Sequence, residues 1–371
     1  MNFRRITPLV VSSLAAILAG CRDEAAPLDP AECTVELEGA CWTYLGLEGK
    51  RVSALAETPW GLFAGTERQG IYRWDARTGR WGRRGLQHLT RAHISALSYV
   101  PTTPPRLLAA IGPSGDVAGS DTEAAVYASE NGGRSWKPWD GGLDAEARLR
   151  GNDAWAFSLA ADPGDPERLY LGVGGGVLRS EDGGRTWRYV EGNEDRMGGG
   201  IHAIVVSPAR DGTVWAGGAG ALFNALLLHT RDWGETWKVF FPRLGSDDIV
   251  FSLLPDPGNL NRLWAGMGGG VRRSDTGGAT GTWKTVLVTR HPSYVTDLHR
   301  IGEAIYAVAE EEEWITPEQP IYPLGLYRSA DGERWDTLSV PPQIRGAWGS
   351  TVDSRGGLLI GTSSGVWRVQ P

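Results

Sequence analysis

The sequence predicts an all-β fold, and three observations support that prediction. The chain has 371 residues, with 52 Gly, 22 Pro and 17 Trp, a composition in which turns are frequent. After the extreme N-terminus no stretch keeps a helical apolar period, whereas short β-branched and aromatic runs recur between Gly and Pro. A polar octad ending on tryptophan also recurs six times, more or less degraded. A repeat of this kind indicates one supersecondary unit used many times.

The octad has the pattern Ser/Thr, any residue, Asp/Asn, any residue, Gly, any residue, Thr/Ser, Trp, and Ser180 to Trp187 is its clearest copy. The Asp or Asn is suited to accept bonds from backbone amides, Gly supplies a positive φ, and Trp leads the next strand into a core. Each octad therefore predicts a turn between two strands. The predicted turn residues are Asp75 and Trp81; Ser129, Asn131 and Trp136; Ser180, Asp182, Gly184, Thr186 and Trp187; Asp232, Gly234, Thr236 and Trp237; Ser274, Asp275 and Trp283; and Ser329, Asp331 and Trp335.

Three further short strands are predicted around each octad. In the clearest repeat they are the apolar runs at 157–159, 168–172 and 176–179, followed by the octad and the strand that its tryptophan begins. Four short antiparallel strands per repeat, punctuated by Gly and Pro, are typical of one blade of a β-propeller.

The number of blades follows from the spacing of the octads. Their tryptophans lie roughly 50 residues apart, which suits one blade each. After Trp335 the chain supplies three more strands, and residues 41–45 resemble the missing fourth. We therefore expect a single seven-bladed β-propeller over residues 36–371, in which an N-terminal strand completes the last blade and leaves no long open sheet edge.

The octads resemble the Asp-box or BNR repeat of sialidases, sortilin-type receptors, photosystem II assembly factors of the Ycf48 type and xyloglucanases. This resemblance covers nearly all of the chain after its N-terminus. It implies a propeller in which the Asp box is a structural turn, lying away from the ligand site.

The N-terminus predicts a lipoprotein of the bacterial cell envelope. Arg4 and Arg5 precede an apolar run too short to span a bilayer, and residues 18–21 match a lipobox. We expect residues 1–20 to be a signal peptide, Cys21 to be acylated, and residues 21–35 to be a flexible linker. Arg22 after the cysteine favours the outer membrane. The alternative is an ordinary signal peptide with a chance cysteine.

Cys33 and Cys41 are expected to form a disulfide in an oxidising space, rather than a metal or redox pair. Neither a cofactor nor a metal site is predicted. The formal charge of −7 and pI near 5.5 disfavour nucleic-acid binding, so the membrane contact is expected through the lipid alone. The acidic run at 310–313 is interpreted as a solvated loop tip, with a cation site as the alternative.

Four long insertions, at 112–124, 138–154, 190–200 and 309–324, are all expected on the face opposite the octads. Elaborated loops on one side of a rigid scaffold are a usual place for recognition. Alignment of the innermost strands places six candidate ligand residues at the channel mouth on that side, called the rim residues below. They are Arg51, His93, Trp155, His202, Tyr294 and Trp348. The alternative is that the tryptophans pack between blades and the histidines are incidental.

Two functions follow from these features. The main prediction is an envelope-anchored, non-catalytic binding or assembly scaffold that engages a protein, peptide or glycan through the rim. The alternative is an exo-acting glycoside hydrolase of the sialidase-like type, which needs two facing carboxylates. Its candidate carboxylates are Asp153, Asp247, Asp248, Asp297 and Glu310 to Glu313. The sialidase arginine set is not recognisable, and two-propeller xyloglucanases are longer than this chain.

Overall fold

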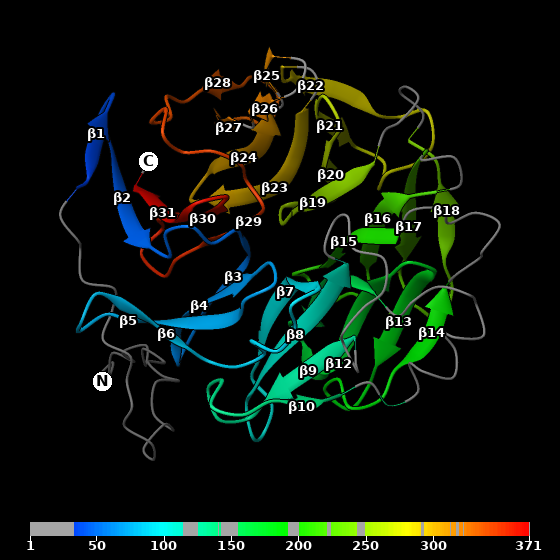
Figure 1. Ribbon diagram of the computed structural model, residues 1–371. Coiled ribbons are helices and arrows are strands. Elements are labelled where there is room, and N and C mark those ends of the chain that lie inside the picture. Colours follow the sequence, from blue (N-terminus) through cyan, green and yellow to red (C-terminus); the bar gives the residue numbers. More distant parts are fainter. Residues whose placement is uncertain are drawn as a thin grey trace, which may run out of the picture.

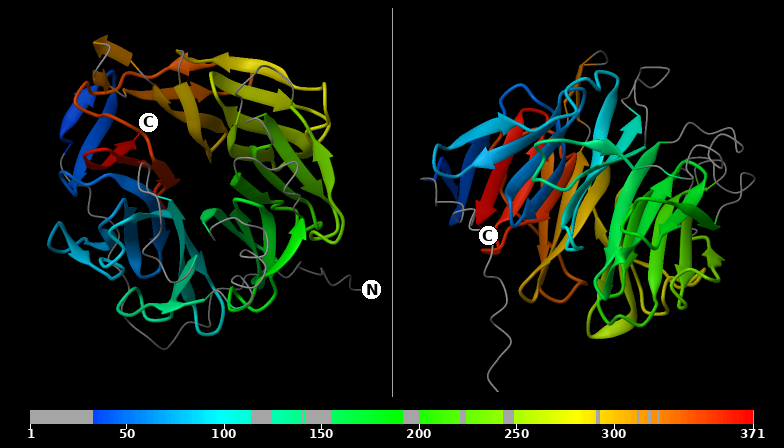
Figure 2. Two further views of the ribbon diagram at one scale, coloured as in Figure 1. Left: turned by 45° about the vertical axis from the view of Figure 1, so that its right-hand side comes forward. Right: turned by 90° about the horizontal axis from the view of Figure 1, so that it is seen from below.

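The computed structural model confirms a seven-bladed propeller of antiparallel sheets (Figures 1 and 2). It describes residues 33–113, 125–139, 141, 155–191, 200–220, 224–242, 249–290, 293–311, 313–316, 319–321 and 323–370. All elements in these ranges are strands. The described part of the chain contains no helix with the length and apolarity needed to cross a membrane. Cys21 and the predicted signal peptide lie outside the described residues, so the anchor stays a prediction.

The first three blades follow the chain in order. Blade 1 has β3 (Val52–Thr58), β4 (Gly61–Thr66), β5 (Gly70–Asp75) and β6 (Arg80–Arg83). Blade 2 has β7 (Ala92–Val100), β8 (Arg106–Pro113), β9 (Val126–Ser129) and β10 (Lys137–Pro138). Blade 3 has β11 (Ala156–Asp162), β12 (Asp165–Val173), β13 (Gly176–Ser180) and β14 (Arg188–Glu191).

The next three blades repeat this order, with one insertion. Blade 4 has β15 (Gly200–Val206), β16 (Val214–Ala219), β17 (Ala225–Thr230) and β18 (Lys238–Phe240). Blade 5 has β19 (Val250–Asp256), β20 (Asn259–Met267), β21 (Gly270–Ser274) and β22 (Lys284–Val288). Blade 6 has β23 (Ser293–Ile301), β24 (Ala304–Glu311), β27 (Leu324–Ser329) and β28 (Asp336–Thr337), with the hairpin of β25 (Glu313–Thr316) and β26 (Gln319–Ile321) inserted before β27.

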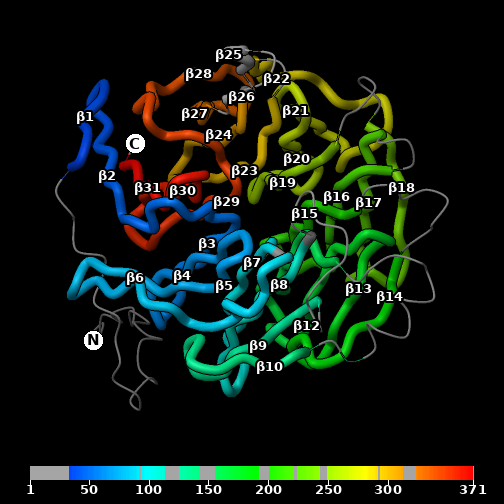
Figure 3. The backbone as a smooth tube through the Cα atoms, in the orientation of Figure 1, coloured from blue at the N-terminus to red at the C-terminus, as the bar shows by residue number. Residues whose placement is uncertain are grey.

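Blade 7 is built from both ends of the described chain. Its strands are β29 (Gly349–Val352), β30 (Leu358–Thr362), β31 (Gly365–Gln370) and β2 (Ala40–Gly46), and Figure 3 shows β2 beside β31. Trp42 of β2 lies opposite Val369 and is 0% exposed. The predicted ring closure is consistent with this pairing. An unpredicted fifth strand, β1 (Val35–Leu37), lies outside β2. The disulfide joins Cys33 to Cys41, whose Cα atoms lie 5.5 Å apart, and holds β1 against β2.

The first strands of neighbouring blades contact one another around the whole ring. These strands, β3, β7, β11, β15, β19, β23 and β29, are called the inner strands below. Apolar clusters form between adjacent blades, as where Leu171 of blade 3 packs with Ala110 and Val126 of blade 2. Burial between blades therefore fixes the ring, and the inner strands present one side to its axis.

The box turns are held by their own side chains. Ser180 Oγ donates to Asp182 Oδ1 at 2.8 Å and accepts from the Gly184 amide at 2.8 Å. The Thr186 amide and hydroxyl donate to Asp182 at 2.9 and 2.6 Å. In the next blade, equivalent hydrogen bonds from Thr230 and Thr236 lower the pKa of Asp232 to about 2.

Asp275 does not take the predicted role of turn acceptor. It pairs instead with Arg262 and Arg273, at 2.8 Å each. Thr276 occupies the acceptor position, because its amide donates to Ser274 Oγ as the Asp182 amide donates to Ser180 Oγ. Asp275 is the second residue of its octad, whereas the acceptor is the third.

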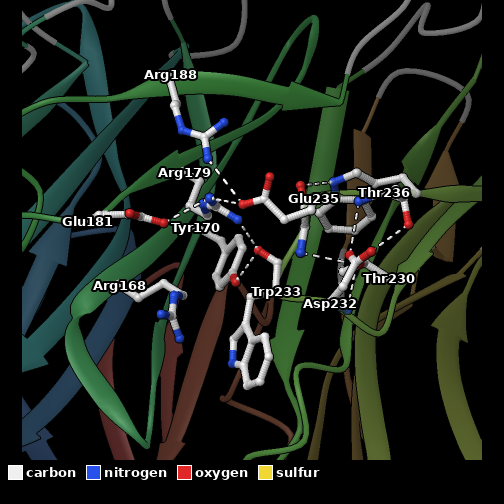
Figure 4. Close-up of polar contacts among 12 residues, drawn as sticks. Arg168, Tyr170, Arg179, Glu181, Arg188, Thr230, Asp232, Trp233, Glu235 and Thr236 are labelled. Carbon is white, nitrogen blue, oxygen red and sulfur yellow. Dashed lines mark hydrogen bonds and ion pairs between the residues drawn. The ribbon is translucent and has the colours of Figure 1, made fainter.

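Four box turns are also bonded to the blade before them. The carbonyl oxygen of the fourth box residue accepts a hydrogen bond from a buried side chain of the preceding blade. The pairs are Arg106 to Gly183, Tyr170 and Arg179 to Trp233, Trp215 to Gly277, and Trp264 to Gly332. Figure 4 shows the pair at Trp233. Each such bond satisfies a turn carbonyl and fixes one blade to the next.

Candidate functional site

A β-bulge recurs at one place on the inner strands. The pairing register shifts in all six blades from the first to the sixth, and each shift leaves one residue unpaired. The unpaired residues are Ser53, Ser95, Phe157, His202, Phe251 and Thr296. A bulge re-aims a side chain, and bulges are common beside active sites. In blade 7, β29 pairs with β30 without a register shift and Ser350 lies opposite Ile360, so the bulge is confined to the six blades named.

Aromatic side chains occupy one side of the ring centre. Ring centroids are 4.7 Å apart for Phe157 and His202, 5.7 Å for His202 and Phe251, and 5.3 Å for Phe251 and Tyr294. We call these four residues the aromatic arc. Gly200 gives it room, because a Cβ there would lie 2.7 Å from the Phe157 ring. Tyr294 is 40% exposed and the other three are half-buried, so the arc presents ring surface to solvent.

Small polar side chains occupy the other bulge positions. The Ser53 hydroxyl donates to the Ile94 carbonyl at 2.8 Å, and the Ser95 hydroxyl donates to the Ala156 carbonyl at 2.6 Å. Both bonds join one inner strand to the next. The bulge positions are therefore of two kinds, with aromatic rings in blades 3, 4 and 5 and hydroxyl groups in blades 6, 1 and 2.

A carboxylate, a hydroxyl and an imidazole meet between blades 6 and 7. Ser350 Oγ donates to Asp297 Oδ2 at 2.8 Å, and His299 Nε2 lies 2.7 Å from the same Oγ. Because Ser350 gives its one proton to Asp297, the His299 nitrogen is the donor in the second bond. The residues form a directed chain from imidazole through hydroxyl to carboxylate.

Burial shifts the protonation of both ends of this chain. It raises the pKa of Asp297 to about 7, against the opposing effect of the bond from Ser350. Burial also lowers the pKa of His299 to about 4, so the imidazole is neutral at ordinary pH. Both side chains keep some exposed surface. Asp297 is therefore a carboxyl group that holds a proton up to neutral pH and can give it to a neighbour.

The structure brings four of the six rim residues into two groups. His202 and Tyr294 belong to the aromatic arc. Arg51 stacks on Trp348, with its guanidinium carbon 3.6 Å from the ring centroid, and it pairs with Glu67 at 2.8 Å. Both groups include residues from blades far apart in the sequence.

Of the two remaining rim residues, His93 lies beside the second group, because its backbone bridges Glu67, the ion-pair partner of Arg51. Its imidazole lies beside Gly112. Trp155 lies directly before β11 and is half-buried. We did not predict His299 from the sequence, although its place two residues after Asp297 on an inner strand was a usable signal.

The acidic run differs from its main interpretation as a solvated loop tip. Glu310 and Glu311 end strand β24, and each is 7% exposed. The Tyr327 hydroxyl donates to Glu311, and burial together with this carboxylate raises the pKa of Tyr327. Within the described residues, no three His, Cys, Asp or Glu side chains group as a metal site. Asp153, Asp247 and Asp248 lie outside the described residues.

Comparison with known proteins connects the chain to xyloglucan-cleaving enzymes. It is 29% identical over 192 residues to an oligoxyloglucan-reducing end-specific xyloglucanase of Emericella nidulans, which covers 48% of this chain and 22% of that protein. It is 26% identical over 187 residues to a probable enzyme of the same name from Neosartorya fischeri, with the same coverage. The chain thus matches about a fifth of the length of these curated relatives. No family profile matches the chain.

Solved structures confirm the fold alone. The GH74 xyloglucanase of Xanthomonas campestris superposes with a TM-score of 0.62 at 18% identity, covering 89% of this chain and 53% of that one. A streptogramin B lyase gives 0.58 at 12% identity, covering 89% of this chain and 97% of that one. The propeller expected from the Asp-box resemblance is thus shown, while membership of that repeat family is not.

These comparisons correct the main functional prediction. A non-catalytic scaffold was expected because the sequence showed no converging carboxylates. The curated proteins that it matches are instead enzymes that cleave a glycan, by their names. The alternative, a glycoside hydrolase, is the better supported of the two predictions.

Proposed function

We propose that this propeller is a glycoside hydrolase acting on a xyloglucan-type polysaccharide or its oligosaccharides. The observation that carries the proposal is the similarity to two xyloglucanases. Two features suit the chemistry, a protonated carboxyl between blades 6 and 7 and a row of aromatic rings in blades 3 to 6. The relatives are much longer than the matched segment, so the substrate class belongs to the proposal.

Asp297 is the proposed general acid. Glycoside hydrolysis needs a carboxylic acid that protonates the leaving oxygen, and such acids have raised pKa values. A pKa of about 7 keeps Asp297 protonated in mildly acidic solution. Ser350 and His299 are positioning residues, since their hydrogen bonds fix the orientation of the carboxyl group.

The aromatic arc is the proposed surface for a sugar ring. A pyranose presents C–H groups that pack on the negative face of an aromatic ring, while its hydroxyls seek polar partners. Phe157 and Phe251 offer such faces, and Ser350 and Asp297 supply polar groups between blades 6 and 7. This arrangement supports binding of a sugar at the centre of the propeller.

The second carboxylate of the reaction is sought among Asp153, Asp247 and Asp248, which belong to segments predicted on the rim side. In the described residues, no hydrogen bond or ion pair links Asp297 to another carboxylate. Alanine variants of the three, assayed with and without azide, identify the partner as the one whose activity azide restores. The anomeric configuration of the sugar first released by the wild-type protein, followed by NMR, reports whether the reaction inverts or retains.

The test is hydrolysis of xyloglucan oligosaccharides, followed by chromatography of the products. We expect Asp297→Asn to lower kcat by about 10²–10⁴-fold, the range for loss of a general acid. The matched control is Asp232→Asn, a box carboxylate on the opposite face, which should leave kcat unchanged. Phe157→Ala should raise KM more than it lowers kcat. A wild-type protein without turnover, or an Asp297→Asn variant with full turnover, would refute the proposal.

The envelope location remains part of the proposal. It rests on Cys21 and the lipobox before it. Labelling of expressing cells with an alkyne fatty acid should mark the wild-type chain and not the Cys21→Ser variant. Equal labelling of the two chains would exclude the anchor.

A further inference from the structure

Trp233 occupies a turn position that the other boxes give to glycine. The fourth box residue is Gly132, Gly183, Gly277 or Gly332 in four other blades, with φ between 69° and 73°. Trp233 stands at the same position with φ 55°. Left-handed backbone costs conformational energy for any residue with a Cβ, and glycine avoids that cost. Blade 4 therefore carries a strained residue where the repeat offers a relaxed one.

Burial does not explain this substitution. Trp233 is 39% exposed, which places it among the few large apolar side chains that the described residues expose. Figure 4 shows its carbonyl turned toward Tyr170 and Arg179, while the indole extends away from that hydrogen-bonded cluster. The bond made by the carbonyl needs no side chain, because Gly183, Gly277 and Gly332 accept the same bond. The turn and its hydrogen bond therefore do not require the indole side chain.

The indole is nevertheless held in one place. Arg168 lies over it, with the guanidinium carbon 5.4 Å from the ring centroid. Arg168 is in turn fixed by Asp162 at 2.9 Å and Asp165 at 3.3 Å. The backbone of Gly212 lies against the ring, because a Cβ there would approach it to 3.1 Å. A rigid, exposed aromatic ring flanked by fixed charged groups is a ready binding surface.

We propose that Trp233, with Arg168 beside it, is a secondary glycan-binding site on the Asp-box face of the propeller. Its ligand is a sugar ring of a pyranose polysaccharide, which packs on the indole while its hydroxyls bond to Arg168 and Asp165. This choice of ligand rests on the proposed function. Backbone strain is retained where it serves a site, and the indole keeps 39% of its surface exposed beside Arg168 and Gly212, which leaves ring surface for an external ligand. The site holds polysaccharide on the face opposite the rim and acts without Asp297.

The test is affinity electrophoresis of the full chain in gels containing soluble xyloglucan, mixed-linkage glucan or galactomannan. We expect at least one polysaccharide to retard the wild-type protein, and Trp233→Gly to weaken that retardation at least tenfold. Trp233→Phe should keep part of it. Trp233→Gly should fold with a Tm within about 2 °C of wild type, since it restores the residue used by the other boxes. The matched control is Val288→Ser, which removes an exposed apolar side chain elsewhere.

The outcomes separate this inference from the hydrolase proposal. Asp297→Asn should lose turnover and keep retardation, while Trp233→Gly should lose retardation and keep turnover of short oligosaccharides. Retardation that depends on Trp233 in a protein without turnover supports the site and refutes the hydrolase. Equal retardation of wild type and Trp233→Gly, no retardation by any of the three polysaccharides, or a Tm loss of more than about 4 °C in Trp233→Gly would overturn the inference.

Discussion

Replacing Asp297 with asparagine should stabilise the protein, and more so as the pH rises. Burial raises the pKa of Asp297 to about 7 from an ordinary value of 3.8. Between these values the folded state holds a proton that the unfolded state has lost, so stability falls as the pH rises through that window. At 1.36 kcal/mol per pKa unit, the carboxylate costs about 4 kcal/mol at pH 8, an upper limit because the side chain is half-buried. At pH 5 the same reasoning gives about 2 kcal/mol.

The assay is urea unfolding of wild type and Asp297→Asn at pH 5 and pH 8. Asparagine keeps an oxygen that accepts the bond from Ser350, so the comparison isolates the charge. His299 titrates in the opposite sense, because its lowered pKa costs stability as the pH falls below about 6.5, and it does so in both proteins. A stability gain that is the same at both pH values, or a loss at pH 8, would refute the reasoning.

Asp232→Asn is the matched control for the direction of the change in stability. Hydrogen bonds from Thr230 and Thr236 lower its pKa to about 2, so its stabilising effect is present above an ordinary value of 3.8 and is lost as the pH falls through 2. This substitution should therefore destabilise the protein at both pH 5 and pH 8. The opposite signs at Asp297 and Asp232 separate a carboxylate placed for chemistry from one placed for structure.

Three further substitutions test the contacts that hold the ring. Ser180→Ala should destabilise by about 1–3 kcal/mol in urea unfolding, because it leaves the buried Gly184 amide without its acceptor. Trp264→Phe should lower the free energy of unfolding by about 1 kcal/mol through loss of the hydrogen bond to the Gly332 carbonyl. An unchanged urea midpoint would show that this bond between blades does not contribute to stability. Cys33→Ser should lower stability by about 2 kcal/mol under oxidising conditions and not in the presence of reductant, which calorimetry can check.

The blade count could be predicted from the sequence because six blades carry a recognisable octad and the strands left over at the two ends suffice for one more. Ring closure by Trp42 followed from the one missing strand. The predicted role of Asp275 was wrong because the acceptor is the third residue of the octad, which is Thr276 in this copy. The bulges were hidden, since an unpaired residue such as Phe157 leaves no mark on local composition. Ser350 meets Asp297 and His299 only because blades 6 and 7 are neighbours, and no spacing along the chain encodes that distance.

Blade 7 has a consequence for how the molecule is made. Its outer strand β2 comes from the start of the described chain and its neighbour β31 from the end, so their pairing is the most non-local contact in the ring. Until the last strands leave the ribosome, a growing chain shows β2 without a partner and an unfinished circle of blades. Unpaired strand edges of this kind favour aggregation with other chains. The ring is therefore protected from edge-to-edge pairing only after its two ends have met.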